Sequence, residues 1–177
     1  AGMMAAGAAA EAGAQVILLE PNDRLGKKLY ITGKGRCNVT NDCGVDQVLK
    51  EVPRNGRFLY SCLEAFPPRA AMDFFEAQGC PLKVERGNRV FPVSDKSADV
   101  VRALERYLRT GRVEIRRERV EALAVEEGRV TGVRTNHGLL SGSRVIVATG
   151  GCSYPLTGST GDGYGLARSV GHTVTEL

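Results

Sequence analysis

The feature that most constrains this sequence is a series of small residues that leads into a strand-like run near the amino terminus. Gly2, Ala6 and Gly13 precede the run QVILLE, which ends at Glu20. A dinucleotide-binding βαβ unit has this spacing from the third glycine of its G-x-G-x-x-G motif onward. Small residues let a helix lie close to a sheet, and Gly13 can end that helix. The pattern therefore predicts a helix followed by a parallel strand that is covered on both faces.

Glu20 lies at the carboxyl end of this predicted strand. A carboxylate there can accept two hydrogen bonds from an adenosine ribose, and it favours the unphosphorylated ribose of FAD or NAD over that of NADP. An ordinary helix–strand pair that ends in a surface glutamate would have the same pattern. We expect Gly2 and Glu20 to contact a dinucleotide.

The composition is that of an ordinary globular domain. Of the 177 residues, 42% are hydrophobic, and no apolar run in the sequence is long enough to span a membrane. Five cysteines occur without a C-x-x-C pair, and the two histidines lie far apart, so we predict neither a disulfide framework nor a metal site. This cysteine usage fits a reducing cytoplasm best.

The positive charge is concentrated in one segment. The chain has a formal net charge of +4, and Arg102–Arg119 alone contains seven arginines against three glutamates. A solvated helix face followed by an exposed strand is one interpretation. Contact with the phosphates of RNA is the other, because clustered arginines bind phosphate groups.

A flexible and basic segment, RLGKKLYITGKGRCNVTN, follows the predicted strand. Its glycines would let backbone N–H groups approach a ligand, and its lysines and Arg36 would offset phosphate charge. In flavin-binding versions of this fold, the corresponding segment crosses beside the pyrophosphate and the flavin ring. A basic surface turn is the alternative interpretation.

Three blocks of the chain resemble the HI0933-like flavoproteins, a group of bacterial FAD-containing oxidoreductases. The first block is GKKLYITGKGRCNVTN. The other two, in the order of the family, are FFEAQGCPLKVERGNRVFPVSDKSADVV and VIVATGGCSYPLTGSTGDGYGLARSVGHTV. The resemblance covers nearly the whole chain, and it implies a Rossmann-like domain that binds FAD non-covalently.

The resemblance also implies which residues contact FAD. They lie beside the predicted strand or in the basic segment after it: Gly2, Glu20, Lys28, Gly33, Arg36, Cys37 and Asn38. The family usually has a further glycine where this chain has Lys34, and we expect this difference to be tolerated. The resemblance places a backbone contact to adenine at Val120, where a plain strand valine is an equal interpretation.

The last third of the chain supplies a second group of predicted contacts. The run VIVATGG, residues 145–151, is predicted to be a buried strand. In this fold such a strand ends beneath the cofactor, which implicates Ala148, Thr149 and Gly150. The third block of the resemblance lies near the flavin in the family, which adds Gly161 and Asp162. Asp162 could instead cap a helix that runs from Tyr164 onward.

The fold class predicted from these observations is α/β, a Rossmann-like FAD-binding domain with a β-meander layer. Residues 44–110 are predicted to be an insertion of helices and one hairpin, followed by a strand and a three-stranded meander. The resemblance implies that residues 1–177 are part of a longer protein. We expect a first strand upstream of Gly2 and an inserted β-rich domain after residue 177.

The predicted activity is that of an FAD-dependent oxidoreductase with NADH or NADPH as the electron donor, and we assign no catalytic residue. No Ser-His-Asp or paired-carboxylate arrangement is legible, which disfavours hydrolysis. The thiolate of Cys37 would be stabilised by Lys34 and Arg36, but no partner cysteine adjoins it, so we expect it to pack against the cofactor. Two alternatives stay open: a flavin-dependent reductase of an RNA base, and a partial domain without activity.

Overall fold

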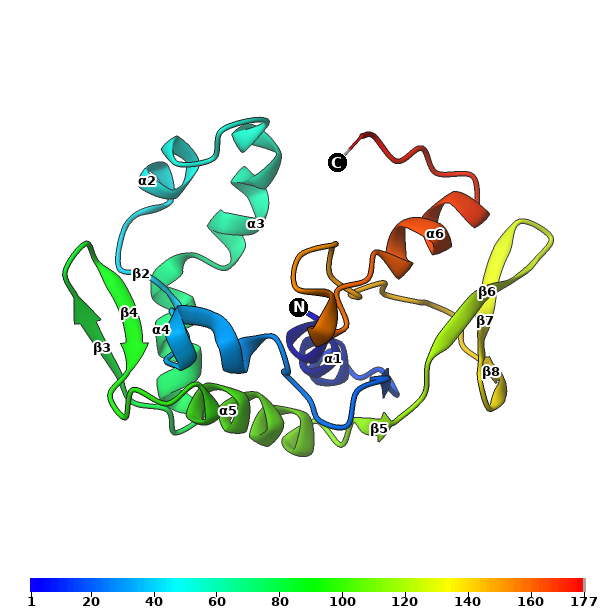
Figure 1. The fold of residues 1–177 in the computed structure, drawn as a ribbon, viewed down its shortest axis with the longest axis horizontal. Helices are drawn as coiled ribbons and strands as arrows, with labels where there is room; N and C mark the ends of the chain where they lie inside the picture. The colour runs from blue at the N-terminus through cyan, green and yellow to red at the C-terminus, as the bar shows by residue number, and fades with distance from the viewer. Residues whose placement is uncertain (177) are drawn as a thin grey trace. The chain divides into compact units, whose positions relative to one another are not determined.

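The computed structural model describes residues 1–176, and its chain divides into two compact units (Figure 1). The terminal unit consists of Ala1–Lys28 and Leu108–Leu177, and the central unit consists of Leu29–Tyr107. Among residues 1–176, none of the helices combines the length and the apolarity that a bilayer crossing requires.

The terminal unit begins with the predicted helix and strand. α1 spans Gly2–Glu11, and β1 spans Ile17–Leu19. Between them Gly13 has a φ of 89°, the left-handed conformation that commonly ends a helix. β1 pairs in parallel with β5, Glu114–Arg116, in the register that places Leu18 opposite Ile115. The small-residue pattern therefore predicts the helix and the parallel strand correctly. The prediction that the strand is covered on both faces is wrong for β1, because Ile17 is 40% exposed and none of its three residues is buried.

The predicted meander is also present. β6, Val120–Glu126, pairs antiparallel with β7, Arg129–Thr135, and β7 pairs antiparallel with β8, Gly138–Ser141. A close backbone approach requires glycine in the middle of β7, since a Cβ at Gly132 would lie 2.1 Å from the carbonyl oxygen of Leu140. At this point β7 and β8 lie so close together that a side chain at position 132 would not fit.

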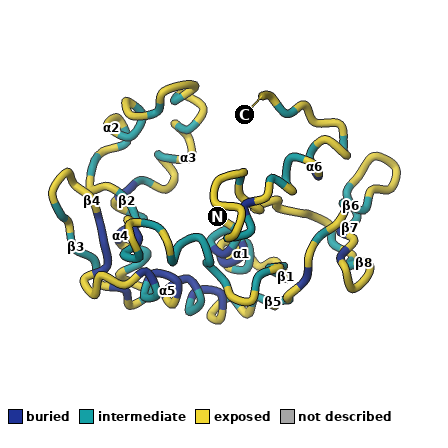
Figure 2. The backbone as a smooth tube through the Cα atoms, viewed as in Figure 1, coloured by how far each residue is buried: buried dark blue, intermediate teal, exposed yellow. Residues whose placement is uncertain are grey.

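The prediction of a buried strand over residues 145–151 is wrong. These residues form no strand, and Val145, Ile146 and Val147 are 37%, 65% and 45% exposed. Figure 2 shows the segment between β8 and α6 mostly in the colour of exposed residues. The apolar run predicts burial, but no strand within residues 1–176 pairs with it, and unpaired backbone groups cannot form a sheet. One side of the run is covered by α6, Asp162–Ser169, because a Cβ at Gly163 would lie 2.5 Å from Thr149 Oγ1.

Helix α6 differs from its prediction at its first residue and at its N-cap. The helix starts at Asp162, two residues earlier than predicted, and its N-cap residue is Gly161, so Asp162 is not the cap. The loop contains a single 3₁₀ turn, η3, Pro155–Thr157. Gly158 and Gly161 follow with φ values of 93° and 80°, which bring the chain sharply into the helix.

The central unit is a three-stranded antiparallel sheet packed with helices. The sheet order is β2, Thr40–Asn41, then β4, Arg89–Pro92, then β3, Leu82–Glu85. The helical segments are η1 (Leu29–Gly35), α2 (Val45–Lys50), η2 (Gly56–Leu59), α3 (Tyr60–Ala65), α4 (Pro68–Ala77) and α5 (Ser97–Thr110). The predicted hairpin is confirmed as β3 and β4, joined through Gly87 and Asn88, which both have positive φ.

The core of the central unit forms around α5. Cys37, Cys80, Val100 and Ala103 are buried together, with Phe75 and Leu82 packed against them. Phe74 makes edge contacts with Phe75 and with Tyr107, at ring-centroid distances of 5.1 and 4.9 Å. The central unit starts at Leu29 and so includes the basic segment from Leu29 onward, whereas residues 24–28 of that segment belong to the terminal unit. The predicted 44–110 insertion and the β-rich domain expected after residue 177 stay predictions.

Candidate functional site

The terminal unit brings together predicted contact residues from both ends of the sequence. A Cβ at Gly2 would lie 3.5 Å from the Ala148 Cβ and 3.7 Å from Leu18 Cδ1. The start of α1 therefore packs between β1 and the 148–150 segment. Both distances are ordinary van der Waals contacts, so a methyl group would also fit at position 2.

Glu20 is only partly engaged by other side chains. Its Oε1 accepts hydrogen bonds from the backbone N and the Nδ2 of Asn22, at 3.0 and 2.6 Å. The Nδ2 of Asn22 also lies 3.4 Å from the carbonyl oxygen of Thr157. Within residues 1–176, no hydrogen bond is recorded to Glu20 Oε2. One carboxylate oxygen at the end of β1 is thus available as an acceptor, while Asn22 fixes the other.

Lys28, the last residue of the Ala1–Lys28 part of the terminal unit, binds the loop that precedes α6. Its Nζ donates to Ser153 Oγ at 2.7 Å and to the Ser153 carbonyl oxygen at 3.3 Å. The same Nζ lies 5.6 Å from the centre of the Tyr154 ring. The side chain therefore acts here as an anchor for a loop 125 positions away in the sequence.

Three further predicted residues lie in the same loop and at the start of α6. Gly150 has a φ of 78°, and a Cβ there would lie 3.1 Å from Ser159 Oγ. The backbone N of Gly161 donates to the carbonyl oxygen of Gly151 at 3.1 Å. Asp162 accepts from Arg119 Nη1 at 2.8 Å, which ties α6 to the chain immediately before Val120.

The basic segment of the central unit forms a tight left-handed turn, Gly33–Asn38. Positive φ values occur at Gly33 (54°), Lys34 (58°), Gly35 (88°) and Cys37 (61°). The backbone N of Cys37 donates to the carbonyl oxygen of Thr32 at 3.0 Å, which closes the turn. A Cβ at Gly33 would lie 3.0 Å from the Asn38 backbone N, so both this close contact and the positive φ favour glycine there.

The turn is attached to β4 through the side chain of Asn38. Its Nδ2 donates to the carbonyl oxygens of Thr40 at 2.7 Å and Val90 at 3.1 Å. The backbone N of Val39 donates to the same Val90 carbonyl at 2.9 Å. The amide of Asn38 therefore has a structural role in the central unit.

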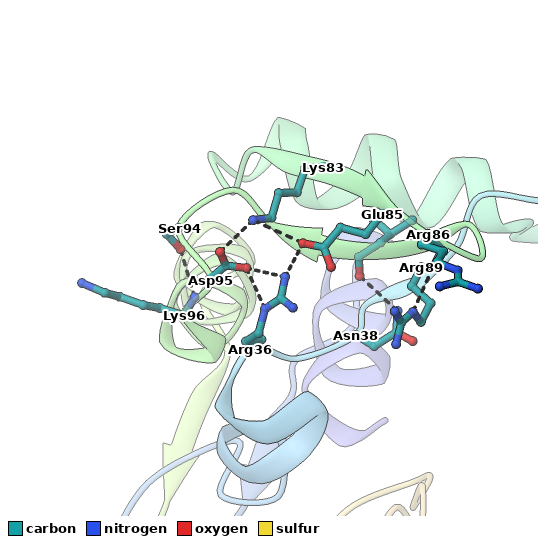
Figure 3. A network of polar contacts seen from close by, with 10 residues as sticks. Arg36, Asn38, Lys83, Glu85, Arg86, Arg89, Ser94, Asp95 and Lys96 are labelled. Carbon is teal, nitrogen blue, oxygen red and sulfur yellow. Dashed lines mark hydrogen bonds and ion pairs between the residues drawn. The ribbon is translucent and has the colours of Figure 1, made fainter.

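Arg36 is engaged by two carboxylates of the central unit (Figure 3). Its Nη2 pairs with Glu85 and lies 2.6 Å from Asp95 Oδ1, and its Nε donates to the same Oδ1 at 2.7 Å. Lys83 Nζ completes the group, 2.7 Å from Asp95 Oδ2 and 3.4 Å from Glu85 Oε1. The Arg36 Cζ also lies 4.1 Å from the centre of the Phe91 ring.

These contacts shift the pKa values of all four ionisable groups. The hydrogen bond from Arg36 lowers the pKa of Glu85, and the hydrogen bond from Lys83 lowers that of Asp95. The same contacts raise the pKa of Arg36, through Glu85 first, and that of Lys83, through Asp95 first. The sequence alone does not reveal this network, because Arg36 is 49 positions from Glu85 and 59 from Asp95.

Cys37 is a core residue of the central unit. It is 2% exposed, shares a buried cluster with Cys80, and has a pKa raised by loss of solvent, with a hydrogen bond from Thr32 opposing the shift. A buried thiol with a raised pKa is a poor nucleophile at neutral pH. Burial of Cys37 thus opposes the thiolate considered for it, and its packing partners include Cys80 and Val100.

Comparison with known proteins identifies the chain at the level of its family. The HI0933-like protein Rossmann domain matches residues 1–177. The chain belongs to the HI0933-like family. This confirms the predicted resemblance and the Rossmann-like α/β fold class, in a family of FAD-dependent flavoproteins.

Two relatives of this HI0933-like chain are enzymes with different substrates. A 3-dehydro-bile acid delta(4,6)-reductase from Clostridium scindens is 38% identical over 180 residues, 99% of this chain and 43% of that protein. A ribosomal RNA dihydrouridine synthase from Escherichia coli K12 is 28% identical over 178 residues, 98% of this chain and 43% of that protein. The chain therefore spans less than half the length of the curated relatives it matches.

One solved structure matches part of the chain at low sequence identity. Glycine oxidase from Bacillus cereus aligns with 84% of this chain and 54% of its own, at 14% sequence identity and a TM-score of 0.48.

Among the described residues of the HI0933-like chain, no three His, Cys, Asp or Glu side chains are grouped so that they could hold a metal ion.

The residues of the terminal unit fit the adenosine half of a dinucleotide. Glu20 Oε2 is an available acceptor at the carboxyl end of a parallel strand, where a ribose is bound in such folds. Gly2 keeps the start of α1 free of a side chain. A helix start of this kind offers backbone N–H groups to a phosphate.

At least four arginines of the Arg102–Arg119 segment have partners within the described part of the HI0933-like chain. Arg102 pairs with Asp99, and Arg106 donates to the Gln78 carbonyl oxygen at 2.6 Å. Arg116 pairs with Glu114 at 2.6 Å, and Arg119 pairs with Asp162. These contacts use part of the positive charge of the segment, and its contact with RNA stays a prediction.

Proposed function

We propose that this protein binds FAD and works as an oxidoreductase. The observation that carries the proposal is the available Oε2 of Glu20 at the carboxyl end of β1, in a chain of the HI0933-like family. Glu20 would accept hydrogen bonds from the adenosine ribose, and Asn22 would hold the carboxylate in place. The start of α1 at Gly2 would offer backbone N–H groups to the diphosphate.

The remaining predicted contacts would act as supports for the cofactor. Lys28 would keep the loop before α6 in place through Ser153. Ala148, Thr149 and Gly150 would let the backbone pass close to the ligand, as their small side chains permit. Bound FAD would supply hydride transfer, and the protein would supply binding, orientation and exclusion of water.

We further propose that the substrate is an alkene conjugated with a carbonyl group, reduced at its carbon–carbon double bond. The support is what the two relatives share. One is named as a delta(4,6)-reductase of a 3-dehydro bile acid, and the other as a synthase of dihydrouridine. Both names describe saturation of a double bond next to a carbonyl. The electrons would come from NADH or NADPH, and one hydride and one proton would be added to the double bond.

The test of FAD binding is a titration of the complete protein encoded by this reading frame. We expect one FAD to bind, and Glu20→Ala to weaken binding about tenfold to a hundredfold, since hydrogen bonds to a charged group contribute roughly 1.5–3 kcal/mol. Glu11→Ala is a matched control, because Glu11 lies at the other end of α1 from Gly2. Equal affinities for the wild type and Glu20→Ala would reject the ribose assignment.

The substrate test compares two classes of acceptor under the same conditions. The reduced enzyme is mixed without oxygen with a 3-oxo-4,6-diene steroid or with a uridine-containing RNA, and reoxidation of the flavin is followed. Reoxidation by the steroid alone supports the reductase of a small alkene. Reoxidation by RNA supports the second candidate, which the 28% identical relative and the Arg102–Arg119 segment favour. No reoxidation by either would leave a non-catalytic domain as the better account.

A further inference from the structure

The terminal unit contains a cleft that the proposed cofactor site does not explain. The cleft lies beside the start of β7 and the end of β8, and its volume is about 1060 Å³. This volume is large enough for a small-molecule ligand. Two arginines, Arg129 and Arg144, belong to its lining. None of the residues that line it is among the predicted contacts of FAD.

The cleft forms where β7 and the chain that leaves β8 move apart. The last backbone hydrogen bond between them runs from the N of Gly142 to the carbonyl oxygen of Thr131, at 2.9 Å. Beyond it, within residues 1–176, no backbone hydrogen bond is recorded between 143–145 and 129–130. Arg129 and Val130 pair with β6 on their other side. One edge of the start of β7 therefore faces an open space.

The two guanidinium groups have few partners in the protein. Arg129 is exposed, and the described part of the chain holds no recorded hydrogen bond or ion pair of its side chain. Glu126 is opposite Arg129 in the register of β6 and β7, but the two form no recorded ion pair. Arg144 Nη1 donates to the carbonyl oxygen of its neighbour Ser143 at 2.7 Å. Both positive charges are thus available to an anion.

The rest of the lining adds hydroxyl groups and a small apolar surface. Thr131, Ser141 and Ser143 lie in the lining, and no hydrogen bond of their hydroxyls is recorded among residues 1–176. A hydroxyl can donate a hydrogen bond to an anionic oxygen. Val130 and Val145 complete the lining with apolar side chains. The cleft therefore combines positive charge, donors and a surface for an organic group.

A phosphate group fits this combination better than a carboxylate does. A phosphate monoester carries a charge of about −1.5 to −2 at neutral pH and has three terminal oxygens. Two guanidinium groups would balance that charge, and each can bind two oxygens through its planar fork. A carboxylate has one charge and two oxygens, so it would leave one arginine without compensation.

We propose that the cleft between the start of β7 and residues 141–145 binds a phosphate group, with Arg129 and Arg144 as its ion-pairing residues. The phosphate belongs to a small phosphate ester or is the free ion, because both present the same chemistry to the arginines. The proposal does not rest on FAD binding, since the lining shares no residue with the proposed cofactor site.

The test is calorimetry of the complete protein at low salt, with phenyl phosphate and with inorganic phosphate as the probes and FAD present throughout. Phenyl phosphate contains no adenosine, so it does not compete for the ribose site at Glu20. We expect saturable binding that Arg129→Met and Arg144→Met each weaken about tenfold, because each removes a charge-assisted contact. Arg134→Met is the matched control and should bind as the wild type does. Arg134 is exposed on the same strand and lies outside the lining.

The two probes distinguish the two sources of phosphate. Tighter binding of phenyl phosphate would support an ester as the ligand, and tighter binding of inorganic phosphate would support the free ion. Benzoate has the same ring and a carboxylate, and it should bind about tenfold more weakly than phenyl phosphate. Benzoate bound as tightly as phenyl phosphate would overturn the assignment to phosphate.

Two further results would overturn the site itself. One is the absence of saturable binding of both phosphates, and the other is a loss in Arg134→Met as large as in Arg129→Met. Chemical denaturation would show whether each variant is folded. If a methionine variant is not, the lysine variant at the same position keeps the charge without the fork, and it should weaken binding about threefold. Unchanged binding in folded Arg129→Lys and Arg144→Lys would exclude contact through the guanidinium forks.

Discussion

Thr135 Oγ1 donates a 2.7 Å hydrogen bond to Glu118 Oε2, and both residues are buried, at 3% and 8% exposure. The hydroxyl joins β7 to the segment that precedes β6, and it satisfies a carboxylate that solvent hardly reaches. His137 Nδ1 lies 3.9 Å from the other carboxylate oxygen. The meander is therefore attached to the rest of the terminal unit through a polar contact in its interior.

Replacing Thr135 by valine should destabilise the protein. The change keeps the shape of the side chain and leaves a buried carboxylate without its donor, which costs about 1.5–3 kcal/mol. Chemical denaturation would measure the loss, and Thr135→Ser, which keeps the hydroxyl, should lose less. A valine variant as stable as the wild type would show that the hydrogen bond contributes little.

Gly132→Ala should be among the most damaging single substitutions in the meander. The new Cβ would lie 2.1 Å from the Leu140 carbonyl oxygen, so β7 and β8 would have to separate. We expect a loss of about 3 kcal/mol or more, as for other substitutions that force the backbone to move. The control is Gly165→Ala in α6, where nothing lies within 4 Å and alanine favours the helix by about 0.5–1 kcal/mol. Equal stabilities of the two variants would contradict this account.

The network around Arg36 predicts sensitivity to acid. The pKa values of Glu85 and Asp95 are lowered in the folded state. Their contribution to stability is therefore present above the unfolded pKa values, near 4, and is lost as pH falls through the lowered folded values. Denaturation at pH 7 and at pH 3 should show a smaller difference for Arg36→Met than for the wild type. A difference of the same size would mean that Arg36 does not cause the shift.

Four of the five cysteines should react in two groups. Cys62 and Cys152 are exposed, whereas Cys37 and Cys80 are buried and have pKa values raised by loss of solvent. A maleimide reagent at pH 7 should label the exposed pair within minutes and the buried pair only after denaturant is added. Mass spectrometry of peptides after short exposure would identify the labelled positions. Early labelling of Cys37 would contradict its place in the core.

Lys34→Gly should not destabilise the folded protein. Glycine adopts a φ of 58° without the cost of about 1 kcal/mol that a side chain brings, although it adds a similar entropy to the unfolded chain. Thermal unfolding should therefore show an unchanged or slightly higher Tm. A clear fall in Tm would show that the lysine side chain stabilises the turn through contacts of its own.

Local sequence patterns predict those helices and strands whose boundaries are marked by residues close together in the sequence. Gly13, the run that ends at Glu20, and the Gly87–Asn88 pair each mark a boundary by backbone chemistry, and α1, β1 and the β3–β4 hairpin follow. The 145–151 run shows the opposite case. Its apolar residues predict burial, but strand formation depends on a neighbouring strand, which no local pattern specifies.

The candidate site divides in the same way. The position of Glu20 at the end of β1 follows from its spacing to the glycines. The partners of Arg36 and Lys28 do not, because they lie from 49 to 125 positions away and are brought near by tertiary packing. The sequence shows where lysines and arginines occur. Only the folded chain shows which of them are paired with carboxylates.

The left-handed turn has a consequence for how such a protein can change over generations. Thr32, Arg36 and Asn38 hold the backbone on either side of position 34, and glycines flank it directly. A different side chain at that one position would change the charge and bulk at the surface of the loop while its path through space stays the same. The architecture of the loop and the chemistry of its tip are thus inherited through separate residues.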